Sequence, residues 1–379
     1  MTHGDEQHDV VIVGGGPIGL CLGVLLAQRG TDVVVLEARS ERTNHSRAIG
    51  IHPPGLRVLA AAGVADALAA QGVAISRGAA RSRGSPVADL AFDPPVLAVP
   101  QWRTEGTLEA RLAELAPTAL RRGVRAAGFA GVGDDAATVR ATGSAGEPRL
   151  FRGRWVVAAD GARSPLRAAL GIPVQERGYP DAYVMGDFAD GTVDGSAAVL
   201  YLEPEGIIES FPLPGGVRRW VVHTDTLVTV PTPDALAALI EQRTGAAVDP
   251  ASNTMLSSFT VRERLAASMR RRRVVLVGDA AHEVSPIGGQ GMTLGWLDAE
   301  AFAPLLADSG YDDWPELWDE VERERRRAAA EAAHHAALNM ALGRSLPPKA
   351  MAARNGIIRG LYRLPPLRSW TARRFTMQT

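Results

Sequence analysis

Residues 9–19 read DVVIVGGGPIG, an uninterrupted apolar run that leads directly into three consecutive glycines. Such a run is typical of a strand that is buried on both faces of a sheet. Residues 20–28 are rich in Leu and Ala and predict a helix that ends near Gly30. Residues 32–36 (DVVVL) predict a second buried strand, so the chain is expected to begin with a β-α-β unit.

The glycines of this stretch fit the pattern G-x-G-x-x-G, which binds the pyrophosphate of a dinucleotide when it joins a strand to a helix. Gly14 allows the tight turn, Gly16 lets a phosphate approach the backbone, and Gly19 lets helix and strand pack closely. Glu37 ends the next strand, where its carboxylate can accept hydrogen bonds from a ribose. A purely structural turn is the alternative, but the strand, the helix and the acid together favour dinucleotide binding.

A second glycine pattern, at residues 131–136 (GVGDDA), fits a looser form of the same motif. The residues that follow it predict a strand and not a helix, so we interpret it as a hairpin turn. The sequence therefore has one dinucleotide fingerprint.

The second informative stretch begins with residues 273–277 (RVVLV), another buried strand. This strand ends at Gly278 and Asp279, and ligands bind at the carboxyl ends of strands in open α/β sheets. The glycines of residues 288–291 precede a predicted helix, where free backbone N–H groups favour negative charge. Asp279 lies more than 240 residues beyond Glu37, which suggests an extended ligand contacted at both ends.

The rest of the chain predicts an α/β fold with a second sheet. Residues 171–230 alternate apolar and polar positions and predict antiparallel strands, residues 77–100 predict irregular structure, and residues 314–342 predict a helix. We expect a Rossmann-like parallel-sheet domain, discontinuous in sequence, with an inserted antiparallel-sheet domain for the substrate and C-terminal helices. The expected boundaries are 1–76, 100–171 and 265–310 for the first domain, 77–99 and 172–264 for the second, and 311–379 for the C-terminal helices.

Composition restricts the possible functions further. The net charge of −1, from 41 basic and 42 acidic residues, argues against binding of nucleic acid through bulk charge. Cys21 is the only cysteine, which excludes an internal disulfide and a cysteine-based metal site. No signal peptide is expected, because the first apolar run, residues 10–13, follows Asp5, Glu6 and Asp9 and is far too short. No membrane span is expected, because no apolar run reaches 18 residues, and a cytoplasmic setting is predicted.

Together these motifs resemble the FAD-dependent aromatic hydroxylases of the para-hydroxybenzoate hydroxylase type, the group A flavoprotein monooxygenases. The likeness rests on residues 14–37, on residues 278–292 (GDAAHEVSPIGGQGM), and on the Asp160-Gly161 pair of residues 159–167. Arg47-Ala48 and Gln101 lie where that family has further cofactor contacts. The sequence departs from the family at Thr293, where an asparagine is usual.

The resemblance implies that the protein binds FAD and uses NAD(P)H as a transient co-substrate without a nicotinamide domain of its own. Reduced flavin and O2 would give a C4a-hydroperoxide, which would hydroxylate an aromatic or polyketide-like small molecule. It further implies catalytic roles for Arg47 and Pro286. The cofactor contacts that it implies are Gly14, Gly16, Pro17, Ile18, Gly19, Glu37, Ala38, Arg39, Arg47, Gln101, Asp160, Gly278, Asp279, Pro286, Gly289, Gln290, Gly291 and Met292.

Several alternatives remain open on the sequence. His223 could be a base or a hydrogen-bond partner in the substrate pocket, or a plain strand histidine; Tyr201, Phe211 and Trp220 could be pocket walls or ordinary sheet packing. His282 is expected to be structural, and no metal site is predicted. A flavin-dependent reductase or other oxidoreductase on the same fold, or a non-catalytic flavin-holding partner subunit, is the alternative function. A halogenase is disfavoured because the chain has no Trp-x-Trp motif, and either a monomer or a homodimer is expected.

Overall fold

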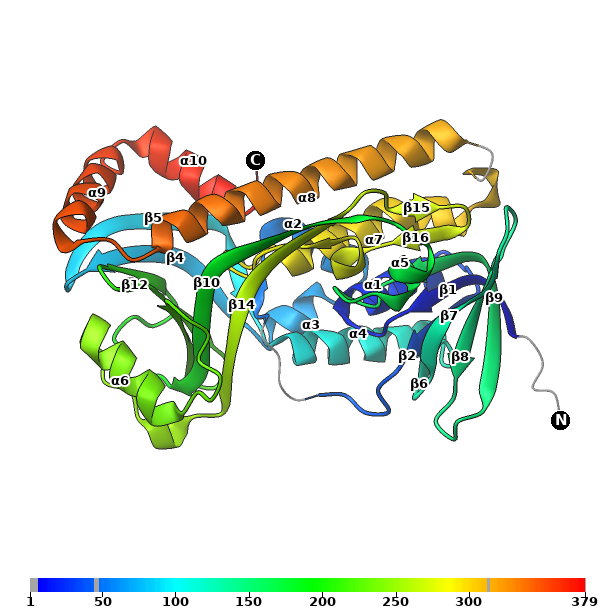
Figure 1. Cartoon of the computed structure of the whole chain (residues 1–379), viewed down its shortest axis with the longest axis horizontal. Coiled ribbons are helices and arrows are strands. Elements are labelled where there is room, and N and C mark those ends of the chain that lie inside the picture. Colours follow the sequence, from blue (N-terminus) through cyan, green and yellow to red (C-terminus); the bar gives the residue numbers. More distant parts are fainter. Residues whose placement is uncertain (1–5, 44–47, 312–313, 379) are drawn as a thin grey trace.

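The structure is a computed structural model that describes residues 6–43, 48–311 and 314–378 (Figure 1). Its first three elements are β1 (Glu6–Val13), α1 (Pro17–Ala27) and β2 (Val33–Glu37). β1 and β2 pair in parallel, with Val10 opposite Val33 and Ile12 opposite Val35, so the expected β-α-β unit is confirmed.

Two glycines fix the turn between β1 and α1. Gly14 has a φ of +113°, and a Cβ atom there would collide with the backbone carbonyl of Ala159. A Cβ atom on Gly19 would collide with the carbonyl oxygen of Gly14. Larger residues would therefore push α1 away from the strands at both positions.

The first sheet has eight strands drawn from widely separated parts of the chain. β1 lies in its centre, parallel to β2 on one side and to β9 on the other, and β9 is parallel to β16. The remaining strands are β6 (Leu120–Arg122), β7 (Arg125–Val132), β8 (Ala137–Thr142), β9 (Pro148–Ala158), β15 (Arg270–Arg271) and β16 (Val274–Leu276). β7 and β8 form a hairpin, as residues 131–136 predict.

The second sheet has nine strands in the order β17-β14-β10-β13-β12-β11-β4-β5-β3. Its strands pair antiparallel, except that β11 and β4 run parallel. The bounds are β3 (Gly50–Ile51), β4 (Val73–Ser82), β5 (Ser85–Ala98), β10 (Val174–Ala189), β11 (Ala198–Glu203), β12 (Gly206–Leu213), β13 (Val217–Thr224), β14 (Met255–Ala266) and β17 (His282–Glu283). Figure 1 shows the long strands β10 and β14 extending from this sheet toward the first one.

The expectation of irregular structure over residues 77–100 is wrong. These residues belong to the long hairpin of β4 and β5, with Ile75, Phe92 and Val96 buried along it. The prolines at 86, 94 and 95 masked the strand pattern in the sequence, because proline weakens a strand prediction. The register of the pairing between β4 and β5 shifts twice, once between Ile75 and Arg77 and once between Ala80 and Arg81.

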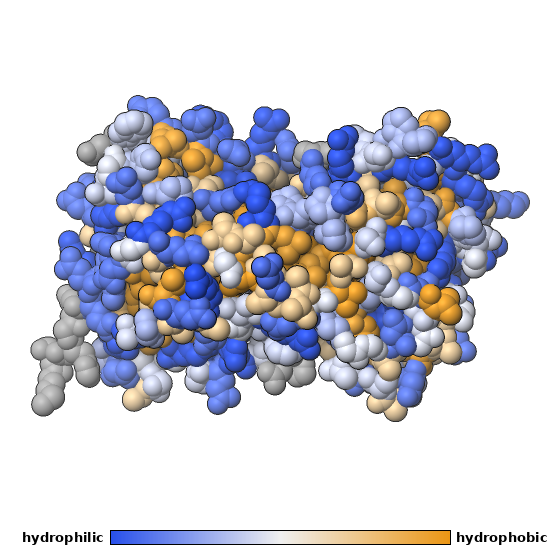
Figure 2. All heavy atoms as spheres, turned by 180° about the vertical axis from the view of Figure 1, so that it is seen from behind, coloured by the Kyte–Doolittle hydropathy of each residue, from blue (hydrophilic) through white to orange (hydrophobic). Residues whose placement is uncertain are grey.

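The helices cover the sheets and join them. α1 packs against α4 and α7, and α8 runs along one side of the molecule from the first sheet to the second (Figure 1). The remaining bounds are α2 (Pro53–Ala61), α3 (Ala65–Ala69), α4 (Gln101–Leu115), α5 (Pro165–Ala169), α6 (Pro233–Thr244), α7 (Gly291–Ala307), α8 (Pro315–Gly343), α9 (Pro348–Leu361) and α10 (Pro365–Phe375), with short 3-10 turns η1 (Pro250–Ser252), η2 (Gly278–Ala280) and η3 (Ser309–Tyr311). Seen from behind, apolar residues gather in the middle of the molecule and hydrophilic residues cover its ends (Figure 2).

Candidate active site

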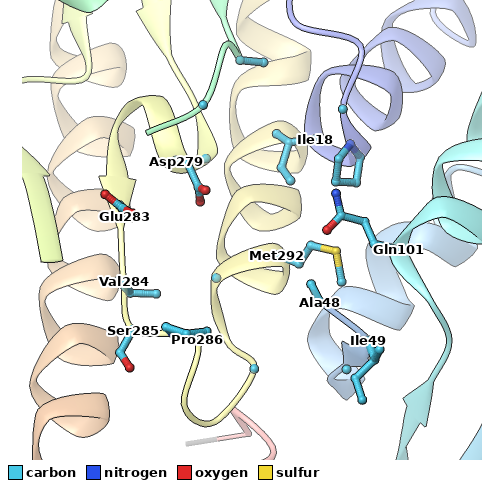
Figure 3. Close-up of a pocket in the computed structure, with 18 of the residues that line it drawn as sticks. Ile18, Ala48, Ile49, Gln101, Asp279, Glu283, Val284, Ser285, Pro286 and Met292 are labelled. Atoms are coloured by element: carbon cyan, nitrogen blue, oxygen red, sulfur yellow. The ribbon is translucent and has the colours of Figure 1, made fainter. Parts of the chain in front are cut away.

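A cavity of about 740 Å³ extends from the glycine turn after β1 to the inner face of the second sheet. Figure 3 shows Ala48, Gln101, Asp279 and Met292 around it, each on a different segment of the chain. Because all these segments meet at one space, a single long ligand can contact them together.

One end of the cavity is formed by the glycine turn and the end of β2. A Cβ atom on Gly16 would meet no protein atom within 4 Å, so the backbone there is open to a ligand. The buried Glu37 accepts a hydrogen bond from the Gly15 N–H at 2.9 Å, and its other oxygen accepts from the backbone N–H and Nε of Arg39, both at 2.9 Å. Burial alone would raise the pKa of Glu37, but these hydrogen bonds and the charge of Arg39 outweigh it and lower the pKa. Glu37 is therefore an oriented carboxylate at the cavity wall.

The middle of the cavity is formed by the turn that follows β16. Gly278 has a φ of +58°, and the next residue, Asp279, opens its side chain into the cavity. The surrounding protein raises the pKa of Asp279 because it replaces water around the carboxyl group. After the end of the neighbouring strand β9, Asp160 Oδ1 is buried without a hydrogen-bond partner among the described residues. Both carboxyl groups can accept hydrogen bonds from hydroxyl groups of a bound ligand.

A buried group of three charged side chains supports this turn from behind. Asp298 of α7 accepts hydrogen bonds from the Gly278 N–H at 3.0 Å, from His282 Nε2 at 2.6 Å and from Arg325 Nε at 2.9 Å. Burial alone would raise the pKa of Asp298, but His282 and Arg325 lower it, and Asp298 in turn raises the pKa of His282 against the effect of burial. The expectation that His282 is structural agrees with this placement outside the cavity lining.

The far part of the cavity is bounded by residues 286–292, which lead into α7. Pro286, Gly289, Gly291 and Met292 line it, and Gly288 and Gly289 have φ values of +95° and +67°. The buried His52 holds this turn, with Nε2 2.9 Å from the carbonyl oxygen of Gly288. Burial lowers the pKa of His52 to about 4, so at neutral pH its ring is uncharged and Nε2–H donates to that carbonyl. The N-terminus of α7 therefore faces the cavity beside a turn that His52 holds.

Thr293 does not line the cavity. It is fully buried, and its Oγ1 accepts a hydrogen bond of 3.4 Å from the backbone N–H of His52. A Cβ atom on Gly55 would lie 2.9 Å from this hydroxyl oxygen. Thr293 therefore packs α7 against the segment before α2, with little room for a larger residue.

The remaining wall is the inner face of the second sheet together with α10. It is largely apolar, with Phe375 of α10 stacked on Phe92 at a ring-centroid distance of 5.5 Å and edge-on to His52 at 6.3 Å. Its other members include Ile75, Val96, Met185, Ala198, Glu209, Phe211, Arg219, Val221 and Phe259, and the polar Thr260 and Arg262 of β14. An aromatic-lined space of this kind suits a flat organic ring.

Most residues that the sequence assigns to the site line this one cavity: Gly14, Gly16, Pro17, Ile18, Glu37, Ala38, Arg39, Gln101, Asp160, Gly278, Asp279, Pro286, Gly289, Gly291 and Met292. Gly19 and Gln290 are buried and are not among the lining residues. Arg47 lies outside the described residues.

His223 is placed apart from the cavity. It is 4% exposed, and its Nε2 lies 3.4 Å from Asp181 Oδ1, on a carboxylate that also accepts two hydrogen bonds from Arg344. Burial lowers the pKa of His223 although Asp181 opposes the shift. Of the aromatic residues considered as pocket walls, Phe211 lines the cavity, whereas Tyr201 and Trp220 stack on each other in a separate apolar cluster.

The cavity wall also includes residues that were not identified from the sequence, among them His52, Glu209 and Phe375. The position of Glu209 could have been predicted from the sequence. Residues 207, 209 and 211 alternate along the strand, so Glu209 lies on the same face as the apolar Ile207 and Phe211. His52 and Phe375 had none, since only the tertiary fold brings them to residues 286–292.

The described residues include no group of three or more His, Cys, Asp or Glu side chains that could hold a metal ion. Within the same residues, no helix has both the length and the apolar character needed to cross a membrane. The donors and acceptors of the cavity instead fit FAD. Gly16 leaves backbone open for a pyrophosphate, Glu37 and Asp279 can accept from hydroxyl groups, and the α7 N-terminus can face the electron-rich edge of a flavin.

Comparison with known proteins gives an independent result. The family model described as "FAD binding domain" matches residues 7–336. The chain is 33% identical over 317 residues to 3-(3-hydroxy-phenyl)propionate/3-hydroxycinnamic acid hydroxylase 2 of Burkholderia vietnamiensis, a match that covers 80% of this chain and 57% of that protein. It is 33% identical over 341 residues to 12-dehydrotetracycline 5-monooxygenase/anhydrotetracycline 6-monooxygenase of Streptomyces rimosus, covering 84% of this chain and 66% of that protein. The chain therefore spans 57% to 66% of the length of these two relatives.

Among solved structures, p-nitrophenol 4-monooxygenase PnpA from Pseudomonas putida superimposes with a TM-score of 0.89 at 26% identity, covering 98% of this chain and 99% of that one. The anhydrotetracycline hydroxylase OxyS from Streptomyces rimosus superimposes with a TM-score of 0.78 at 28% identity, covering 98% of this chain and 76% of that one.

Proposed function

The chain belongs to the FAD binding domain family, and its relatives are aromatic hydroxylases and monooxygenases of the group A flavoproteins; from that membership we propose that it is an FAD-dependent monooxygenase. It would use NAD(P)H and O2 to hydroxylate an aromatic or polyketide-like small molecule. The observation that carries this proposal is the single cavity that joins the glycine turn after β1 to the aromatic-lined face of the second sheet. A dinucleotide in one part of it would present its ring system to a substrate in the other.

FAD would be held along the whole first sheet. Glu37 would accept from the ribose of the adenosine part, Gly14 and Gly16 would leave room for the pyrophosphate, and Asp279 would accept from the ribityl chain. Asp160, Gln101 and the backbone of residues 286–292 would contact the remainder. Arg47 stays a proposed flavin contact on the sequence resemblance alone.

When bound, FAD would accept a hydride from NAD(P)H and would activate O2 so that one oxygen atom is transferred to the substrate ring. The residues of the chain would orient the reactants and exclude water. The uncharged His52 fixes Gly288, and Phe92 and Phe375 close the aromatic end. Pro286 lines the cavity and would bound the ring site, whereas the pairing of His223 with Asp181 favours a structural part for that histidine.

We propose the domain division on the same grounds. Residues 1–76, 100–171 and 265–310 would form the FAD-binding domain, which contains the first sheet. Residues 77–99 and 172–264 would form the substrate domain with most of the second sheet, whereas β3, β17 and the start of β4 join that sheet from the other ranges. Residues 311–379 would form the C-terminal helical part.

The test is turnover by the purified protein reconstituted with FAD. NADH or NADPH oxidation is followed in the presence of 4-nitrophenol, 3-(3-hydroxyphenyl)propionate and anhydrotetracycline, and products are analysed by mass spectrometry under ¹⁸O2. A ring product that gains one ¹⁸O atom supports the proposal. NAD(P)H oxidation without any oxygenated product would indicate a reductase or another oxidoreductase, and the absence of NAD(P)H oxidation would indicate a flavin-holding subunit.

A further inference from the structure

Glu209 is a carboxyl group in the apolar part of the cavity wall. It lies on β12, with Ile207 and Phe211 on the same face of the strand, and its neighbours across the sheet are Leu200 of β11 and Val221 of β13. It is 7% exposed, and that exposure is toward the cavity that it lines. A carboxyl group in this position faces whatever occupies the aromatic end.

In the part of the chain that the structure describes, the side chain of Glu209 has no hydrogen-bond or ion-pair partner. The residues beside it belong to a buried apolar cluster that includes Met185, Ile207, Val221, Ile287 and Met340, with Phe211 and Phe259 packed against it. Burial in such surroundings raises the pKa of Glu209 to about 7. An unpaired buried carboxyl group costs stability, so its presence at a cavity suggests a part in binding.

The other charged groups on this face are already paired within the protein. Arg219, which also lines the cavity, donates to both oxygens of Asp187 at 2.6 and 2.7 Å. Asp181 is paired with Arg344. Burial and, to a smaller extent, the charges of Glu209 and Asp181 raise the pKa of Tyr183. Its buried Oη also lacks a hydrogen-bond partner among the described residues, but Tyr183 does not line the cavity. Glu209 is thus an acceptor at this end that the described residues leave unsatisfied.

We propose that Glu209 is a specificity-determining residue: its carboxylate accepts a hydrogen bond from a hydroxyl group on the ring of the substrate. This rests on the proposed function, because it requires an aromatic substrate at the inner face of the second sheet. A hydroxyl group satisfies the buried acceptor, whereas an ether leaves it unsatisfied and an anionic substituent is repelled by it. The preferred substrate therefore carries a neutral O–H at this position, with any anionic substituent elsewhere on the molecule.

The experiment compares matched ligands on the FAD-loaded protein. The probes are 4-nitrophenol with 4-nitroanisole and 4-nitrobenzoate, and 3-(3-hydroxyphenyl)propionate with its methyl ether. Dissociation constants are measured by the change in the flavin absorption spectrum. At pH 8 the wild-type protein should bind 3-(3-hydroxyphenyl)propionate, whose ring hydroxyl is neutral, about 10- to 100-fold more tightly than its methyl ether, as expected for a hydrogen bond to a charged group. 4-Nitrophenol is largely ionised at this pH and should behave like the anion 4-nitrobenzoate.

Glu209→Leu should abolish this preference and Glu209→Gln should reduce it, while anions such as 4-nitrobenzoate should bind more tightly to both variants than to the wild type. The matched control is Glu203→Gln. Glu203 is also a buried glutamate of this sheet, 3% exposed, but it accepts from the Arg83 N–H at 2.8 Å and lies outside the cavity lining. This control should keep the wild-type preference, and unchanged FAD content in each variant shows that the fold is kept.

The outcomes separate the two proposals. An unchanged ratio of phenol to ether binding in Glu209→Leu, no preference in the wild type, or no binding of any of these rings overturns the assignment of Glu209. If the wild type then still transfers oxygen to a ring that lacks a hydroxyl group, the proposed monooxygenase activity is supported although the assignment of Glu209 has failed. If no ring is oxygenated but the binding preference depends on Glu209, the assignment holds and the proposed activity fails.

Discussion

His282 Nε2 lies 2.6 Å from Asp298 Oδ2, and both side chains are buried directly behind the turn that presents Asp279. Asp298 also binds Arg325 and the Gly278 N–H, so one carboxylate connects α7, α8 and the end of β16. The position of Asp279 is therefore set by contacts within the protein before any ligand binds.

Asp298→Asn should destabilise the protein strongly. The variant removes the negative charge that compensates Arg325 and His282, and breaking a buried ion pair typically costs about 3–5 kcal/mol. The measurement is the unfolding free energy from urea denaturation. Glu300→Gln on the same helix is the control, because its pair with Arg57 is partly exposed and contributes under about 1 kcal/mol. Equal effects of the two variants would contradict the structural part assigned to Asp298.

Asp279→Ala should weaken FAD binding while the fold is retained. The loss of a hydrogen bond to a charged acceptor costs about 1.5–3 kcal/mol, or roughly one to two decades in the dissociation constant. Fluorescence titration of the apoprotein with FAD measures this change. An unchanged dissociation constant would show that Asp279 does not contact the ribityl chain.

Glu37→Ala should weaken FAD by a similar factor and leave the NAD(P)H dependence of flavin reduction nearly unchanged. Glu37 is held at the glycine turn by Gly15 and Arg39, and the chain has one dinucleotide fingerprint. Anaerobic stopped-flow reduction at several NAD(P)H concentrations gives the second quantity. Weaker NAD(P)H binding with normal FAD binding would assign the fingerprint to the nicotinamide nucleotide.

Two glycines of the same turn should respond in opposite ways to substitution. Gly14→Ala should prevent stable folding, because φ is +113° and the new Cβ would collide with Ala159. Gly16→Ala should leave the melting temperature of the apoprotein nearly unchanged and weaken FAD, since its Cβ meets no protein atom and points where the pyrophosphate would lie. Thermal unfolding of both apoproteins, with an FAD titration of Gly16→Ala, tests the pair. Normal FAD affinity in Gly16→Ala would remove the turn from the site.

Glu209 should make stability fall as pH rises. Its pKa is about 7 in the folded protein against an ordinary value of 4.5 in the unfolded chain. Between pH 4.5 and pH 7 the folded state therefore binds more protons than the unfolded state, and the free energy of unfolding decreases as the pH rises through this range. The loss should amount to about 3 kcal/mol and level off above pH 7. The unfolding free energy of wild type minus that of Glu209→Gln, measured from pH 4.5 to 8, isolates this contribution from other groups. A difference that is constant with pH would show that Glu209 has an ordinary pKa.

The parts of the fold that could be predicted are those encoded in contiguous residues. Residues 9–37 and 273–292 each contain a buried strand, a glycine turn and a helix start, and the structure brings both to one cavity. The hairpin of β4 and β5 was missed because its prolines concealed a strand pattern that pairing overrides.

Side-chain directions in the second sheet could not be predicted in the same way. Glu209 faces the cavity and His223 faces Asp181, although both lie on strands of similar alternating pattern. Which of them reaches the cavity depends on the pairing register of β12 and β13 and on how far along the strand the cavity extends. His52 and Phe375 meet beside the cavity from positions more than 300 residues apart, a contact that no local pattern encodes.

The walls of the cavity are contributed by residues as far apart in the sequence as Val13 and Phe375. During synthesis, the glycine turn leaves the ribosome long before α10 exists, so the ring end stays open while the residues between them are made. The complete site can form only when residue 375 has emerged and α10 has docked on β5. Tight capture of the cofactor would therefore have to wait until α10 has been made and has docked on β5.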